Sequence, residues 1–456
     1  MHQIGYTRTL FATLALLGAC LSPSIAAAVE FRLDGLYRFE ASLFDTLSLN
    51  RDADDSEGTR NYLDHRLRLT PHIRLSPQVH VFVEFDVMDA MRFGSTPEVL
   101  AADGQFQDNG SPFNEPIALS GSVIPGSDYT ESMFVRRAWA ELYTPWFDLK
   151  VGRMASNWGM GLLANDGSCD RCYYGDIVDR VMISTSRLDP VRLSFAVDMR
   201  SEGFINRNDD THSFLLSGGY LGEVHRIGGY LRWTRQPSNK FNVVHGDIWA
   251  TTRLGPLSLE LEALILWGQA EDTELGVENL SILAGGGALD AVLSINPWEI
   301  GFQLGVASGD SNGQDNEWHT LTMDRDHNIG LLMFEQPMPV YAHGDAATEE
   351  NQNIDLSRQL TGSGVSNAVY LRPRFHIDIR EDLRAGVILI AAFPAVKEAF
   401  PGEPDAYGLE IDVELLWTLY GNFELGARAG FLFPGEVFGE NRDFTFGGDL
   451  RALVHF

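Results

Sequence analysis

The chain ends in a segment whose side chains alternate between apolar and polar. Counting back in twos, one face is apolar or glycine throughout: Phe456, Val454, Ala452, Leu450, Gly448, Phe446 and Phe444. This two-residue period predicts a β-strand with one apolar and one wet face. In a soluble protein such an edge invites aggregation, whereas a closed barrel pairs its last strand with its first. The alternative is the final strand of a secreted β-sandwich.

The same alternation is strongest at residues 29–44. Phe31, Leu33 and Phe39 lie on one face, whereas Arg32 and Glu40 lie on the other. Charged side chains cannot lie in lipid, so this face is expected to line a wet lumen. The segment is longer than an ordinary sandwich strand, and about ten residues suffice to cross a bilayer at a tilt.

Seventeen further segments repeat this pattern, so the sequence predicts an all-β fold, a transmembrane antiparallel β-barrel of about eighteen strands. Sixteen remains open because strand ends are uncertain. Tight turns alternate with longer connections, as short periplasmic turns and long outer loops would, which places both termini on the periplasmic side. The predicted segments are 61–75, 78–91, 132–143, 146–154, 177–185, 190–200, 212–220, 224–235, 241–254, 256–269, 277–295, 297–307, 365–380, 382–395, 405–419, 422–434 and 443–456.

The N-terminus carries an export signal. Arg8 precedes an apolar run at residues 10–21, and Ala26-Ala27-Ala28 provides an A-x-A end, so residues 1–28 are predicted to be a signal peptide. The mature barrel would then be residues 29–456. The alternative is a lipobox at residues 17–20, which would lipidate Cys20.

The chain is acidic, with 63 Asp and Glu against 34 Lys and Arg and a net charge of -29. Much of this excess lies in the predicted loops. An acidic surface excludes nucleic acid as a natural partner. Acidic loops could attract cations or bridge through divalent ions to lipopolysaccharide, or could simply keep the surface soluble.

Charged residues recur in twos along the predicted lumen face, which makes them pore-lining candidates. Like charges in ladders set ion selectivity in pores, although opposite charges could instead neutralise each other across strands. A basic wall and an acidic wall are expected to face the lumen. The candidates are Arg66, Arg68, Arg74, Arg372, Arg374 and Arg380 in the basic wall, and Glu410, Asp412 and Glu414 in the acidic wall.

Three short strings resemble known motifs without their context. Residues 309–313 match G-x-S-x-G but are followed by no helical pattern. Residues 324–335 resemble a calcium loop but have Ile329 where the sharp turn requires glycine. Cys169 and Cys172 form a C-x-x-C pair, for which a loop disulfide is expected in an oxidising compartment. We therefore predict no catalytic residues, no metal and no cofactor.

Two patches carry a family resemblance. Residues 150–167, KVGRMASNWGMGLLANDG, resemble a strand-and-loop segment of outer-membrane porins of the alginate-export type. Residues 323–335, MDRDHNIGLLMFE, resemble a late extracellular segment of related uncharacterised barrels. The resemblance implies a large even-stranded barrel that passes an anionic polysaccharide through an arginine-rich lumen.

Together these features predict a monomeric bacterial outer-membrane channel for passive passage of hydrophilic or anionic solutes. The expected partners are the assembly machinery, which reads a C-terminal Phe in such barrels, and outer-membrane lipid and lipopolysaccharide. The loops at 92–131 and 308–364 exceed the usual loop length, and at least one is expected to fold inward and narrow the pore. The alternatives are a plugged structural or surface-binding barrel and an outer-membrane hydrolase.

Overall fold

The computed structural model describes residues 29–45, 59–94, 133–169, 171–173, 175–201, 211–237, 240–272, 277–312, 315–335, 364–400, 402–438 and 444–456. The predicted signal peptide, its lipobox and most of the loop at 92–131 lie outside these residues. The strands are β1 (Glu30–Phe44), β2 (Arg60–Ser76), β3 (Val79–Gly94), β4 (Met133–Tyr143), β5 (Phe147–Ala155), β6 (Ile177–Thr185), β7 (Val191–Ser201), β8 (Thr211–Leu221), β9 (His225–Gln236), β10 (Phe241–Leu254), β11 (Leu257–Asp272), β12 (Val277–Ile295), β13 (Trp298–Ala307), β14 (Glu317–Trp318), β15 (Ala368–Arg380), β16 (Leu383–Pro394), β17 (Gly408–Leu419), β18 (Phe423–Pro434) and β19 (Thr445–His455).

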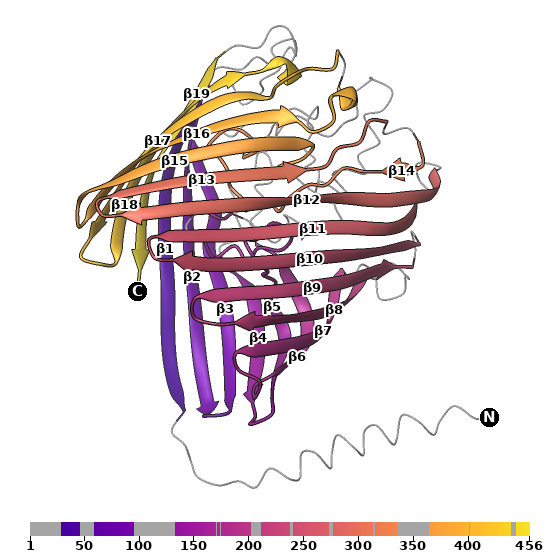
Figure 1. The fold of residues 1–456 in the computed structure, drawn as a ribbon. Coiled ribbons are helices and arrows are strands. Elements are labelled where there is room, and N and C mark those ends of the chain that lie inside the picture. Colours follow the sequence, from indigo (N-terminus) through magenta and orange to yellow (C-terminus); the bar gives the residue numbers. More distant parts are fainter. Residues whose placement is uncertain are drawn as a thin grey trace.

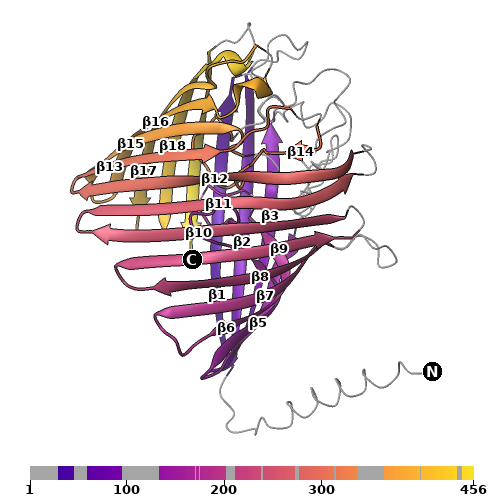
Figure 2. The ribbon, with the colours of Figure 1, turned by 45° about the vertical axis from the view of Figure 1, so that its right-hand side comes forward.

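Eighteen of these strands form a closed antiparallel barrel, as predicted. Each pairs with its neighbours in sequence, and β1 pairs with β19 to close the ring. The two-residue β14 lies outside the ring, because it pairs parallel with β12 while β13 pairs directly with β15. In Figures 1 and 2, β9 to β13 form the wall opposite β1 to β3.

The helical content of the described residues is small. It comprises the 3-10 turns η4 (Lys397–Ala399) and η5 (Glu436–Phe438). Among these residues, no helix is both long and apolar enough to cross a membrane.

The two faces of the wall differ as the alternation predicted. In β9, the apolar side chains of Ile227, Leu231 and Trp233 are exposed, whereas Arg232 and Thr234 are buried. The buried side chains of β9 therefore face the lumen. There they contact other polar side chains and the part of the chain that lies inside the barrel. Exposed apolar residues recur on most strands of the ring.

The terminal residue Phe456 completes the seam between β1 and β19. Gly35 donates its N–H to the Phe456 carbonyl at 2.7 Å and accepts the Phe456 N–H at 3.0 Å. A Cβ on Gly35 would lie 2.3 Å from the Phe456 ring, so the ring covers this glycine. Because Gly35 has no side chain, the Phe456 ring can pack directly against β1.

We expect Gly35→Val to displace the Phe456 ring and weaken the seam. The loss of the ring's packing corresponds to about 1–2 kcal/mol, and it should lower the temperature at which the folded band disappears on gels. In a Phe456→Ala background the same substitution should change little, because the two residues are in direct contact. Equal effects in both backgrounds would show that the ring does not depend on Gly35.

Candidate functional site

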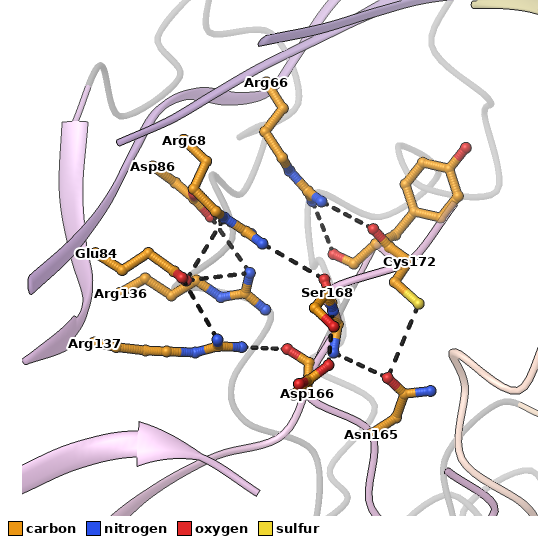
Figure 3. A network of polar contacts seen from close by, with 12 residues as sticks. Arg66, Arg68, Glu84, Asp86, Arg136, Arg137, Asn165, Asp166, Ser168 and Cys172 are labelled. Atoms are coloured by element: carbon orange, nitrogen blue, oxygen red, sulfur yellow. Dashed lines mark hydrogen bonds and ion pairs between the residues drawn. The ribbon is translucent and has the colours of Figure 1, made fainter. Parts of the chain in front are cut away.

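A dense group of charges lines the lumen on β2, β3 and β4. Arg68 donates to both carboxylate oxygens of Asp86, at 2.7 and 2.8 Å. Arg136 lies 3.7 Å from Glu84 and from Asp86, and Arg137 lies 3.5 Å from Glu84 (Figure 3). All five side chains are at most 9% exposed. Opposite charges on neighbouring strands therefore largely neutralise each other here.

A β-bulge explains why two consecutive arginines share this face. Strand β4 pairs Val135 with Phe85 and Arg137 with Glu84, which leaves Arg136 as the extra residue. Such a bulge re-aims a side chain that would otherwise point the opposite way. Counting in twos from either end of β4 marks only one of the two arginines as a lumen residue, so strict alternation could not identify both.

The chain between β5 and β6 crosses the lumen, and we call residues 156–169 and 171–173 the first inward segment. Backbone carbonyls of this segment accept hydrogen bonds from arginines of the wall (Figure 3). Arg66 donates to the carbonyls of Cys172 at 2.9 Å and Tyr173 at 3.0 Å, and Arg38 donates to the Cys172 carbonyl at 3.3 Å. Arg66 thus holds the segment instead of standing free in the lumen.

The other end of the first inward segment is anchored on β10 and β11. Trp158 donates its indole N–H to Asp247 at 2.7 Å, and the Met160 N–H donates to Glu262. Gly159 has φ +56°, and a Cβ there would lie 2.4 Å from the Glu262 carboxylate. This glycine is therefore needed for the close approach between the turn and Glu262. Because β11 lies across the ring from β2, the segment spans the lumen.

Residues 321–335 form a second inward segment, so the long loop after β13 folds into the barrel as expected. The Asp324 N–H donates to the Leu162 carbonyl at 2.8 Å, and the Tyr173 N–H donates to Asp326 at 2.8 Å. The two inward segments are thus hydrogen-bonded to each other. The inward course of the first segment was not predicted from the sequence.

Glu410 anchors the second inward segment to the wall. Its carboxylate accepts three successive backbone N–H groups, those of Leu331 and Leu332 at 2.8 Å and that of Met333 at 2.7 Å. Glu410 is completely buried. Because three successive backbone N–H groups point to this one carboxylate, the contact fixes the position of residues 331–333.

Apolar packing adds to these polar anchors. Met323, Ile329 and Met333 are 0% exposed and belong to one cluster with Leu162 of the first segment. The wall contributes Tyr370, Ile390 and Leu432 to the same cluster. The barrel therefore encloses a hydrophobic core on one side of its lumen, which the alternating pattern of the strands did not reveal.

The second inward segment carries a buried histidine. His327 Nε2 lies 2.8 Å from the Tyr370 hydroxyl. Burial, and secondarily the charge of Arg372, lowers the pKa of His327 from 6.5 to about 3. By contrast, burial raises the pKa of Asp324 and of Glu335 above their usual values.

We predict that His327 stabilises the anchored position of the second inward segment in a way that depends on pH. Because the pKa is lowered in the anchored state, the contribution of His327 is present above pH 6.5 and is lost as the pH falls toward about 3. The raised pKa values of Asp324 and Glu335 act in the opposite direction. We expect acidification to change channel conductance differently in His327→Gln than in the wild type. Identical pH profiles would contradict this.

The remaining predicted site residues are mostly paired. Arg74 meets Glu30 at 2.9 Å, both partly exposed, and Arg374 meets Asp290 at 2.8 Å. Glu414 accepts from Arg171 of the first inward segment at 3.1 Å. It also lies 2.8 Å from His376 Nε2. Glu414 of β17 thus connects the acidic wall to the first inward segment and to β15, which carries part of the basic wall.

Arg372 and Asp412 face the lumen beside these pairs. The Nε of Arg372 is buried and has no hydrogen-bond partner among the described residues. Asp412 is 2% exposed on the face that also carries Glu410. Both residues lie on the lumen side of the wall, and their role in lining a pore stays a prediction.

The expectation for Arg380 needs correction. A register shift between Asp378 and Arg380 places Arg380 opposite Leu383, on the outer face of the wall. Its guanidinium carbon lies 5.9 Å from the centre of the Trp417 ring, and Arg380 pairs with Asp382 at 2.9 Å. The irregularity broke the two-residue period on which the prediction rested.

Several residues of this network were not among the site candidates predicted from the sequence. Arg38 and Glu40 lie on a face that the alternation marked as wet, so that signal could have identified them. Tyr173 carries no such signal, since it lies in a loop, yet its hydroxyl donates to Glu40 at 2.5 Å. Contacts between a loop and a distant strand have no local pattern.

The structure joins Cys169 to Cys172 by a disulfide within the first inward segment. We predict that thiol labelling of unreduced, denatured mature protein finds no free cysteine. Because the closed loop is very short, its removal should cost little global stability. Two labelled thiols per chain would contradict the pairing.

The other motif-like strings form ordinary loop contacts. Asp310 accepts the N–H groups of Asn312 and His319, each at 3.0 Å, whereas Gly313 lies outside the described residues. In the calcium-like string, Asp324 accepts the Asp326 N–H at 2.8 Å. Across the described part of the chain, no group of three or more His, Cys, Asp or Glu could hold a metal ion.

Comparisons with known proteins show the fold. No known protein family matches the sequence, and no curated protein matches it. Among solved structures, OccK9 (OpdG) of Pseudomonas aeruginosa is similar with TM-score 0.55 and 13% identity over 94% of this chain and 99% of that chain.

Two further structures cover 94% of this chain and 98% of their own. A BenF-like porin from Pseudomonas fluorescens Pf-5 has TM-score 0.54 and 9% identity. OccK5 (OpdH) of Pseudomonas aeruginosa has TM-score 0.53 and 10% identity. These comparisons do not support the resemblance to alginate-export porins. They show that the chain has the fold of large outer-membrane porin barrels.

Proposed function

We propose that this protein is a bacterial outer-membrane channel through which small hydrophilic or anionic solutes pass passively. The outer surface supports membrane insertion. On β9 to β11, the outward positions are apolar or glycine from the row Ile227, Ala250 and Leu261 as far as the row Arg235, Asn242 and Gln269, whose members are cross-strand neighbours at one margin. An apolar band bounded by a polar row is what a bilayer and its headgroups require.

The observation that carries the channel proposal is the contrast between this band and the charged lumen. A barrel of this strand number has room for an aqueous channel, and the two inward segments would narrow it. Arg66, Arg68, Arg74, Arg372 and Arg374 are the proposed basic lining. Asp412 and Glu414, together with Glu410, which holds the second inward segment, are the proposed acidic lining. Lipid, lipopolysaccharide and the assembly machinery are the proposed partners of a monomer.

A specific observation favours a second candidate, a plugged barrel. The inward segments are hydrogen-bonded to each other and enclose a hydrophobic core, as a plug would. Recording from purified protein in a planar bilayer separates the two candidates. We expect stepwise conductance from an open channel, whereas silence from folded, inserted barrels would favour the plug and overturn the channel proposal.

A further inference from the structure

The disulfide of the first inward segment is reachable from one side only. Cys169 is exposed, whereas Cys172 is 0% exposed. The Cys172 N–H donates to the Cys169 carbonyl at 3.0 Å, so the two residues close a tight turn. A dissolved thiol that enters the lumen would therefore meet Cys169 and not Cys172.

The residues that follow the exposed sulfur join two parts of the wall. Arg171 pairs with Glu414 of β17 at 3.1 Å. The carbonyls of Cys172 and Tyr173 accept hydrogen bonds from Arg66 of β2 at 2.9 and 3.0 Å. Cys172 takes part both in the disulfide and in these contacts with the wall. The disulfide therefore constrains the backbone that Arg66 and Glu414 hold.

The sulfur of Cys172 is enclosed by oxygen acceptors. Its Sγ lies 3.9 Å from Asn165 Oδ1 and 3.9 Å from the Asp326 carbonyl oxygen. A thiol can donate to such oxygens and a thiolate cannot, so the sulfur that leaves is expected to end as a thiol. The exposed Cys169 and the enclosed leaving group thus lie on opposite ends of the same bond.

We propose that Cys169 is a thiol-exchange site for low-molecular-weight thiols. A thiolate RS⁻ attacks Cys169 Sγ, a new R–S–S–Cys169 bond forms, and the Cys172 sulfur leaves as a thiolate that takes a proton from water. A second RS⁻ attacks the sulfur of the R group, which yields RSSR and the Cys169 thiolate. Opening the bond loosens residues 171–173 from Arg66 and Glu414. The effect on permeation rests on the proposed channel function.

The test uses the full mature protein, folded in detergent and treated with glutathione. We expect mass mapping to find the mixed disulfide on Cys169, with Cys172 as the free thiol. Faster hydrogen exchange at residues 165–173 should accompany it. An adduct that forms only after denaturation, or that forms on Cys172, would overturn the exchange site. An adduct without faster exchange would overturn the loosening.

Bilayer recording then tests the consequence for permeation. Glutathione should increase the conductance of the wild type, whereas Cys169→Ser/Cys172→Ser should show the higher conductance from the start and no response. A wild-type conductance that stays constant after a confirmed adduct would overturn the link to permeation. The adduct and the exchange rates are measured without a current, so a silent barrel would contradict the channel proposal and leave the test of Cys169 intact.

Discussion

Glu410→Ala is expected to release the second inward segment and to raise channel conductance strongly. The substitution removes the acceptor of three buried N–H groups, those of Leu331, Leu332 and Met333. Each unsatisfied group costs about 1–3 kcal/mol, so the anchored position becomes unfavourable unless the segment moves. The backbone ladder of the barrel is unaffected, so a folded, heat-modifiable band should persist on gels.

Glu260→Ala is the matched control for this prediction. Glu260 is also a lumen-facing carboxylate, but it accepts from Trp249 at 2.8 Å on the neighbouring strand. Its removal should leave the conductance near the wild-type value. If both variants conduct alike, the second inward segment is held by its apolar packing and not by Glu410.

The sequence predicted the barrel because its signal is local and repeated. In β6 and β10 the predicted bounds agree with the structure at both ends. The two-residue period also assigned Arg66 and Glu410 to the lumen. Alternation failed at Arg136 and Arg380, where an extra residue shifts the register and reverses the face.

The interior of the barrel could not be predicted in the same way. Residues such as Trp158 and Tyr173 contact strands far away in the sequence, and no periodicity encodes these contacts. The alternation predicts charge ladders that line an open pore, yet Arg66 and Glu410 form hydrogen bonds with the backbone of the inward segments. Loop length was the signal in the sequence for inward folding. The connection after β13 is long enough to give this signal, whereas the connection after β5 is not.

Arg66→Ala combined with Arg68→Ala is expected to preserve assembly and to shift selectivity toward cations. The change removes two positive charges from the lumen and takes Arg68 away from Asp86 and Glu84, which keep their contacts with Arg136 and Arg137. Breaking a buried ion pair costs about 3–5 kcal/mol, but the closed backbone ladder should keep the barrel folded. The zero-current potential in a salt gradient measures the shift.

Leu67→Arg is the contrasting variant, because Leu67 lies between these arginines on the opposite face of β2. An arginine on the outer surface of a barrel at the bilayer midplane costs about 2–4 kcal/mol, so assembly should be impaired. Gel mobility with and without heating reports folding. If the double variant fails to assemble while Leu67→Arg is tolerated, the faces of β2 are reversed. If both assemble and the zero-current potential stays unchanged, Arg66 and Arg68 hold the first inward segment without lying along the ion path.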